Sequence, residues 1–103
     1  MRIRYRPTAV AQLDAIFSYI AQRSPQSATR VVETIKRNID RLAEFRYSAR
    51  ASEVPGIREL PIVRYPYIVF YAVDDVANEI HILRIRHTSQ DPKHHLERGR
   101  VRP

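Results

Sequence analysis

The chain of 103 residues contains no cysteine and only two glycines. The absence of cysteine excludes a disulfide framework, a thiolate nucleophile and a cysteine-ligated zinc site, so packing alone has to hold the fold, as suits a reducing cytoplasm. Two glycines cannot build the glycine-rich loops that cradle phosphates, and neither G-x-x-x-x-G-K-[ST] nor G-x-G-x-x-G occurs. We therefore expect a cytoplasmic protein without a cofactor.

Long hydrophobic runs are also missing. No apolar run approaches the roughly 18–20 residues that a membrane span needs, and the basic segment Met1–Arg6 is not followed by the apolar stretch of a signal peptide. We expect a chain that is neither exported nor inserted in a membrane. The adjacent His94 and His95 lack the spacing of a metal site, so no metal is expected.

What the chain has in excess is arginine. Eighteen basic residues, all but Lys36 and Lys93 arginine, stand against eleven acidic ones and give a net charge of +7. Guanidinium groups bind phosphates and carboxylates in a bidentate way, so the charge indicates nucleic acid, an acidic protein, or both as partner. A genomic bias toward arginine codons is an alternative explanation of the Arg to Lys ratio, but it does not explain the net charge.

The first half of the chain predicts a strand and two helices. Arg and apolar residues alternate over Met1–Arg6, as in a half-buried strand. Thr8 is the expected N-cap of a helix that ends near Arg23, and Ser24 is the expected N-cap of a second helix with Pro25 at its first position. Apolar residues at helical spacing continue from 28 to 45, which predicts an antiparallel helix hairpin.

The second half predicts a loop and three strands. Residues 47–55 have no periodicity; 57–62 indicate a strand in which Pro61 marks an edge or a bulge, and 67–73 a central strand. A polar turn then leads into a third strand over 79–87, which forms a hairpin with the second. The order β-α-α-β-β-β predicts a two-layer α+β domain over residues 1–90, with the helix hairpin on one face of a mainly antiparallel four-stranded sheet. We expect residues 91–103 to be a basic tail that orders only on a partner.

The last strand carries the candidate target-binding residues. Strict alternation places Arg84 and Arg86 on one face with Ile80 and Ile82. One interpretation puts the two arginines at a basic groove on the uncovered sheet face, near Arg58 or Arg64. The other makes them solvated charges paired with Glu59 or Glu79.

Three further features are candidates for function, and the first two have two interpretations each. His87, at the end of the strand, is either a general acid or base or a capping residue. The cluster Tyr65, Tyr67 and Tyr71 either stacks on nucleobases or belongs to the core. The exposed side of the helices is expected to bind an acidic partner. The residues of that side are Phe17, Tyr19, Arg30, Arg37 and Arg41.

Four segments in this order resemble the RelE/ParE family of toxins from bacterial type II toxin–antitoxin systems, over about residues 3–90. They are Ile3-Arg4-Tyr5-Arg6-Pro7-Thr8-Ala9 with Leu13-Asp14 and Ile16, then Ile57-Arg58-Glu59-Leu60, Pro66-Tyr67-Ile68-Val69-Phe70-Tyr71 and Ile82-Leu83-Arg84-Ile85-Arg86-His87. The resemblance implies either a ribosome-dependent mRNA endonuclease of the RelE type or a ParE-type toxin that acts on DNA gyrase. For the endonuclease it implies a catalytic set drawn from Arg58, Arg84, Arg86 and His87.

Two departures from the ribonuclease pattern favour the ParE branch. Tyr67 follows Pro66 where the ribonucleases commonly have an arginine, and Thr88-Ser89-Gln90-Asp91 replaces a basic run after His87. The long helix hairpin favours the same branch. The resemblance therefore predicts a non-enzymatic gyrase inhibitor in a hetero-oligomer with an antitoxin, whose acidic C-terminal segment wraps the toxin. The predicted target-binding residues are Arg58, Arg64, Arg84, Arg86 and His87, and the predicted antitoxin-binding residues are Phe17, Tyr19, Arg30, Arg37, Arg41 and Tyr67. A nuclease, or an inactive member that binds nucleic acid, is the alternative.

Overall fold

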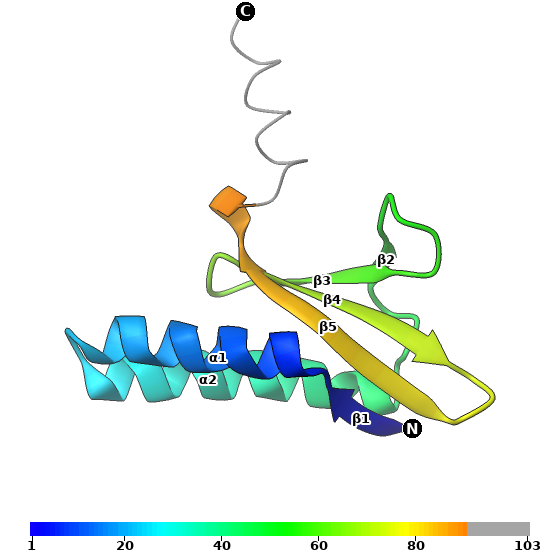
Figure 1. The fold of residues 1–103 in the computed structure, drawn as a ribbon, viewed down its shortest axis with the longest axis horizontal. Helices are drawn as coiled ribbons and strands as arrows, with labels where there is room; N and C mark the ends of the chain where they lie inside the picture. Colours follow the sequence, from blue (N-terminus) through cyan, green and yellow to red (C-terminus); the bar gives the residue numbers. More distant parts are fainter. Residues whose placement is uncertain (91–103) are drawn as a thin grey trace, which may run out of the picture.

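A computed structural model describes residues 1–90, in which a strand and two helices are followed by four more strands (Figure 1). The elements are β1 (Arg2–Tyr5), α1 (Pro7–Ala21), α2 (Pro25–Asp40), a 3₁₀ turn η1 (Arg41–Ala43), β2 (Arg50–Ala51), β3 (Arg58–Ile62), β4 (Tyr67–Asp74), β5 (Glu79–His87) and a second 3₁₀ turn η2 (Thr88–Gln90). The predicted basic tail, residues 91–103, lies outside the described residues. None of the helices within residues 1–90 is long and apolar enough to cross a membrane.

The five strands form one sheet in the order β1-β5-β4-β3-β2. β1 runs parallel to β5, and every other neighbouring pair is antiparallel. The predicted two-layer α+β fold, with its helix hairpin and its central β4, is confirmed. The sheet has five strands instead of four because Arg50 and Ala51, in the segment predicted as a loop, pair with Glu59 and Arg58.

The two helices begin at prolines. α1 starts at Pro7 with Arg6 as its N-cap, so the prediction of Thr8 as the cap is wrong. Pro7 takes the first helical position, where its fixed φ fits and its missing N–H is not needed, so the cap lies at Arg6, two residues upstream of Thr8. Ser24 caps α2 as predicted, because its Oγ accepts a hydrogen bond from Ser27 N–H at 3.2 Å.

The core lies between the helix pair and one face of the sheet. Its largest fully buried side chains come from α2 with η1, from β4 and from β5: Tyr71, Ile35, Ile39, Leu42, Ile80, Ile82 and Val69. The apolar stripe of α2 ends at Leu42, since Phe45 is 59% exposed and does not belong to the core. Figure 1 shows α1 and α2 side by side, with β5 crossing the sheet next to α1.

A β-bulge interrupts the alternation of side chains along β5. Phe70 on β4 lies opposite Arg84, whereas the next residue, Tyr71, lies opposite Ile82. Leu83 is therefore the extra residue of the bulge, and beyond it every side chain of β5 changes face.

The bulge corrects the predicted faces of the last strand. Ile85 is 2% exposed and belongs to the same core as Ile80 and Ile82, on the face that the helices cover. Arg84 and Arg86 consequently lie on the opposite, open face. The prediction that these arginines share a face with Ile80 and Ile82 is wrong, because it assumed an uninterrupted period of two.

Candidate functional site

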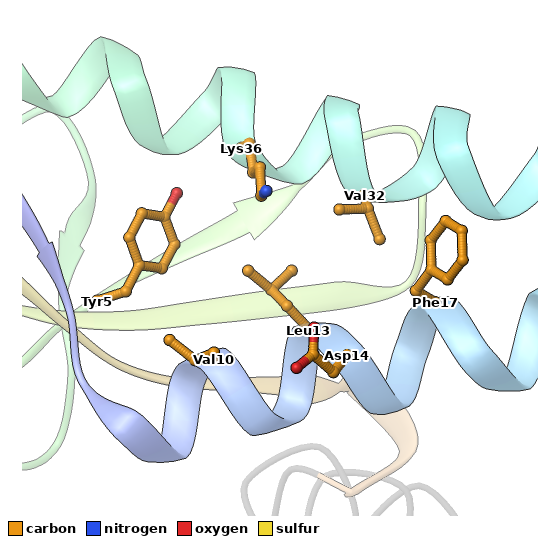
Figure 2. A pocket seen from close by; sticks show the side chains of 7 residues that line it. All are labelled: Tyr5, Val10, Leu13, Asp14, Phe17, Val32 and Lys36. Atoms are coloured by element: carbon orange, nitrogen blue, oxygen red, sulfur yellow. The ribbon is translucent and has the colours of Figure 1, made fainter.

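An apolar groove runs between α1 and α2, and we call it the helix groove (Figure 2). It has a volume of about 530 Å³ and is lined by Tyr5, Val10, Leu13, Asp14, Phe17, Val32 and Lys36. Val10 is 44% exposed and Phe17 is 39% exposed, although both lie on the apolar stripe of the helix. Exposed apolar side chains along a groove between helices suit the apolar face of another helix.

The polar atoms of the helix groove are few. Asp14 and Lys36 contribute one charge of each sign, and Tyr5 contributes a hydroxyl. Burial, with a smaller contribution from the Asp40 carboxylate, raises the pKa of Tyr5 to about 12. The hydroxyl is therefore uncharged near neutral pH and is available as a hydrogen-bond donor.

A second groove, the edge groove, lies between α1 and the end of β5. Its volume is about 500 Å³, and it is lined by Gln12, Ala15, Ile16, Tyr19, Tyr67, Ile85, His87 and Ser89. It brings together Tyr19 and Tyr67, both predicted to bind the antitoxin, with His87. Burial, followed by the neighbouring Tyr19, raises the pKa of Tyr67.

His87 is held by its neighbours in this groove. Its Nδ1 accepts the backbone N–H of Ser89 at 3.1 Å and lies 2.8 Å from the Ser89 hydroxyl. Its ring packs edge-on against Tyr67, with ring centroids 5.4 Å apart at 84°. These contacts are those of the capping residue that was one of the two interpretations of His87.

Exposed arginines line the outer side of α2 and η1. Arg30, Arg37 and Arg41 are exposed and form no ion pair with another described residue. Their spacing of seven and four residues puts them on one side of the helix. They form a positive stripe that is free to attract acidic groups.

The open sheet face carries another two arginines without an ion pair among residues 1–90. Arg84 is exposed and Arg86 half-buried, and they lie directly across from Phe70 and Ile68 of β4. Alternate residues of a strand are about 6.6–6.8 Å apart, so the two guanidinium groups share one small area of this face. This pair could contact an anionic target.

The two buried carboxylates of the open face are already paired. Glu59, 4% exposed, accepts a hydrogen bond from Arg50 Nε. Glu79, 8% exposed, lies 2.9 Å from Arg2 Nη2, 3.2 Å from Arg4 Nε and 3.1 Å from His81 Nε2. The interpretation in which Arg84 and Arg86 pair with Glu59 or Glu79 is therefore wrong, because other cations occupy both carboxylates.

Arg58 is directed toward the segment that follows η1. It donates hydrogen bonds to Ala49 O and Tyr47 O, and its guanidinium lies 5.2 Å from the centroid of the Tyr47 ring. Arg58 faces the same side of the sheet as Tyr71, with which it is paired on the neighbouring strand β4. The Tyr71 hydroxyl donates a hydrogen bond to Arg46 O at 2.8 Å. Arg58 thus fastens the 46–49 segment to the sheet.

The structure does not bring the predicted target-binding residues together. Arg58 and His87 lie on the helix-covered side, and Arg84 and Arg86 lie on the open face. Arg64 is exposed in the turn between β3 and β4. The candidate catalytic set implied by the ribonuclease branch is therefore divided between two faces of the sheet.

Two features of the site have no signal in the sequence. Gln12 of α1 accepts the backbone N–H of Ile85 at 2.6 Å, a contact between residues 73 positions apart. Tyr47 donates to Asp75 at 2.6 Å, and the same carboxylate lies 3.1 Å from Arg46 Nε. Neither pair could be found from spacing, because each joins a helix or loop to a distant strand or turn.

The comparisons with known proteins agree with this fold of two helices on a five-stranded sheet. A sequence profile of the family described as "ParE toxin of type II toxin-antitoxin system, parDE" matches residues 3–92. The chain belongs to this family of ParE toxins. It is therefore a toxin of a type II toxin–antitoxin system, within the ParE/RelE superfamily.

Relatives carry the names of both branches. The chain is 40% identical over 82 residues to toxin RelE2 of Caulobacter vibrioides, covering 80% of this chain and 89% of that one. A structure of the chromosomal ParDE system of P. aeruginosa matches with a TM-score of 0.74 at 33% identity, over 84% of this chain and 95% of that one. The isolated RelE toxin of E. coli matches with a TM-score of 0.63 over 97% of each chain, but at 11% identity it shows the fold alone.

Proposed function

We propose that the chain is a ParE-like toxin that inhibits DNA gyrase and that a cognate antitoxin neutralises it in the cytoplasm. The observation that carries the choice of target is the separation of His87 from Arg84 and Arg86 by the sheet. RNA cleavage requires a proton-transfer group within hydrogen-bond reach of the reacting atoms, beside the cations that hold the phosphate. With His87 on one side and the arginine pair on the other, binding is better supported than catalysis.

Arg84 and Arg86 are the residues that contact the target in this proposal. They lie on the open face without an ion pair to another residue of 1–90, and the half-buried Phe70 beside them offers apolar contact. Arg64 adds a peripheral charge at the neighbouring turn. Arg58 acts indirectly, since its hydrogen bonds hold the 46–49 segment.

The helix groove and the arginine stripe of α2 support the antitoxin part of the proposal. Val10 and Phe17 offer an apolar seat for an amphipathic segment, and Arg30, Arg37 and Arg41 match acidic residues on its polar side. A segment that folds as it binds can cover both surfaces at once, which gives a tight hetero-oligomer. The net charge of +7 speeds its association.

Induced expression with and without the neighbouring antitoxin gene tests both parts. The expected result is growth arrest without the antitoxin, with inhibited supercoiling, a DNA-damage response and ongoing translation. Rapid arrest of translation with cleaved mRNA would instead support the RelE-type endonuclease. Normal growth of cells that contain the folded toxin alone would contradict the proposal as a whole.

A further inference from the structure

The bulge at Leu83 brings Arg84 and Arg86 to the open face of the sheet. Ile80 and Ile82, which precede the bulge, lie in the core, and an uninterrupted alternation would turn both arginines toward that same side. Bulges that re-aim side chains are over-represented beside functional sites. The extra residue of β5 thus places two cations on a surface that no helix of residues 1–90 covers.

An aromatic side chain lies next to these cations. Phe70 of β4 is half-buried and lies directly across from Arg84 on β5 and from Glu59 on β3. The Glu59 carboxylate is in turn neutralised by Arg50 of β2, with which it forms an ion pair. Cross-strand partners on one face have Cβ atoms about 4.5–5.5 Å apart, so the four side chains form a row across the open face. Within this row the Phe70 ring has an arginine on one side and a neutralised carboxylate on the other.

This arrangement matches the two chemical parts of a nucleic-acid strand. Arg84 and Arg86 are alternate residues of β5, so they are about 6.6–6.8 Å apart, which is close to the separation of successive phosphates along an extended strand. Their guanidinium groups can bind phosphates in a bidentate way. An aromatic ring on an open sheet face, beside such cations, gives an unpaired base a surface on which to stack. An acidic protein surface would use the charges but would give the ring no planar partner.

The neighbours of Phe70 along β4 favour DNA over RNA. On the open face these neighbours are the buried Ile68 and the half-buried Ala72. Neither side chain can form a hydrogen bond with a 2′-hydroxyl, the group by which proteins distinguish RNA from DNA. The bases of a duplex are stacked inside it and cannot reach the ring, so the strand has to be unpaired.

We infer that the open face binds single-stranded DNA, with one base stacked on Phe70 and the adjacent phosphates held by Arg84 and Arg86. The inference rests on the proposed function and deepens it, because gyrase cuts and holds DNA strands and so presents them to a toxin bound beside it. The ligand of the two arginines is then a DNA strand held by the enzyme and not an acidic surface of the enzyme itself.

Fluorescence anisotropy of the full-length toxin with a labelled oligodeoxyuridine of about 12 nucleotides, within the usual range of site sizes, tests the inference. Arg84→Ala and Arg86→Ala should each reduce the slope of log affinity against log salt by about 0.7, the contribution of one phosphate contact to a single strand. Arg23→Ala removes an exposed arginine from the turn between α1 and α2 and is the matched control, which should leave the slope unchanged.

The Phe70 ring is tested separately from the charges. Phe70→Leu should weaken binding about tenfold with the same salt slope, because stacking is lost while the arginines remain. Phe70→Tyr keeps a ring and should bind like the wild type. An abasic oligomer of the same length should bind equally to the wild type and Phe70→Leu, since it has no base to stack. Circular dichroism compares the folds of the variants.

The outcomes separate the inference from the proposed function. Equal affinity of the wild type and Phe70→Leu for the probe, or equal salt slopes of Arg84→Ala and Arg23→Ala, overturns the inference; inhibition of gyrase by the same wild-type preparation then leaves the proposed function standing. Tighter binding of oligouridine, which differs from the probe at the 2′ position alone, identifies RNA as the ligand and also overturns the inference. Normal supercoiling by gyrase beside a toxin that binds the probe as expected overturns the proposed function and leaves the DNA-binding surface in place.

Discussion

On the helix-covered side, two grooves of about 530 and 500 Å³ expose Val10, Phe17 and Tyr19, and the charges of Asp14 and Lys36 in the helix groove offset each other. On the open face, no helix of residues 1–90 covers the sheet, and Arg84 and Arg86 have no carboxylate partner in the same part of the chain. The first side offers shape and apolar area to a polypeptide, whereas the second offers charge to an anionic surface. The difference separates the determinants of neutralisation from those of toxicity.

The largest expected effect is on the open face. The double substitution Arg84→Ala and Arg86→Ala should abolish growth inhibition on induction, because it removes the cations that contact the target. Arg84 is exposed and Arg86 half-buried, and neither has an ion pair within residues 1–90, so the free energy of unfolding should change by less than about 1 kcal/mol. Plating efficiency and urea unfolding measure the two effects. Retained toxicity in the doubly substituted, folded protein would exclude the open face as the target-binding site.

A substitution in the helix groove should weaken binding of the antitoxin and leave the toxin's target-binding residues intact. Phe17→Asp removes an apolar anchor worth about 2 kcal/mol and places a charge in the groove, so affinity for the antitoxin should fall roughly 30-fold or more. Toxicity should be unchanged. Ser18→Asp, at the next exposed position of α1, is the matched control for charge. Isothermal titration calorimetry gives the affinities, and equal values for the two variants would rule out the groove.

A substitution of Arg58 tests whether this side chain positions the 46–49 segment on the helix-covered side of the sheet. Arg58→Ala removes its hydrogen bonds to Ala49 O and Tyr47 O and its contact with the Tyr47 ring. The free energy of unfolding should fall by about 2 kcal/mol. Exchange of amides in the 46–49 segment should accelerate. Loss of toxicity without a loss of stability would instead indicate direct contact with the target.

The arginine stripe should act on association more than on dissociation. Replacing Arg30, Arg37 and Arg41 together by alanine should slow binding of the antitoxin about tenfold at low salt, with little change in the dissociation rate. The difference from the wild type should shrink as salt screens the charges. Stopped-flow kinetics at several salt concentrations measures both rates. A deficit that is independent of salt would contradict steering by the stripe.

The smallest effect concerns Tyr5. Its pKa is raised to about 12 in the folded chain, above the ordinary value of 10.0, so folding favours the neutral phenol. The corresponding stability is fully present below pH 10 and is lost as the pH rises toward 12. Because Tyr5 is only half-buried, we expect a loss of about 1 kcal/mol. Tyr5→Phe should remove this part of the pH dependence in urea unfolding between pH 9 and 11.5, and an unchanged profile would contradict it.

Local patterns predicted the parts of the fold that repeat over many residues. The helix hairpin followed from apolar spacing and from the Ser24 cap, and the central β4 from its run of aromatic and β-branched residues. β2 was missed because two residues are too few to show a period. The bulge at Leu83 was missed because this leucine fits either face of a strand, and only pairing with β4 reveals the extra residue.

The same limits apply to the candidate site. Tyr19 and Tyr67 were both predicted to bind the antitoxin. The structure places them in the same groove, although 48 positions separate them in the sequence. The prediction that Arg58 and Arg84 lie in one site is wrong, because the sheet face on which a side chain lies depends on the register between strands. That register cannot be inferred from the residue types alone. The contact of Gln12 with Ile85 depends on where β1 stops beside β5, which is a property of the assembled sheet.

The central claim is that toxicity and neutralisation depend on different sides of the sheet. It is tested most directly by measuring gyrase supercoiling inhibition and antitoxin affinity on the same two purified proteins, Phe17→Asp and the Arg84→Ala, Arg86→Ala double variant. The account predicts that Phe17→Asp inhibits gyrase like the wild type but binds antitoxin at least 30-fold more weakly. It predicts that the double variant loses inhibition while its antitoxin affinity changes only a few-fold. Parallel loss of both activities in either protein would contradict it.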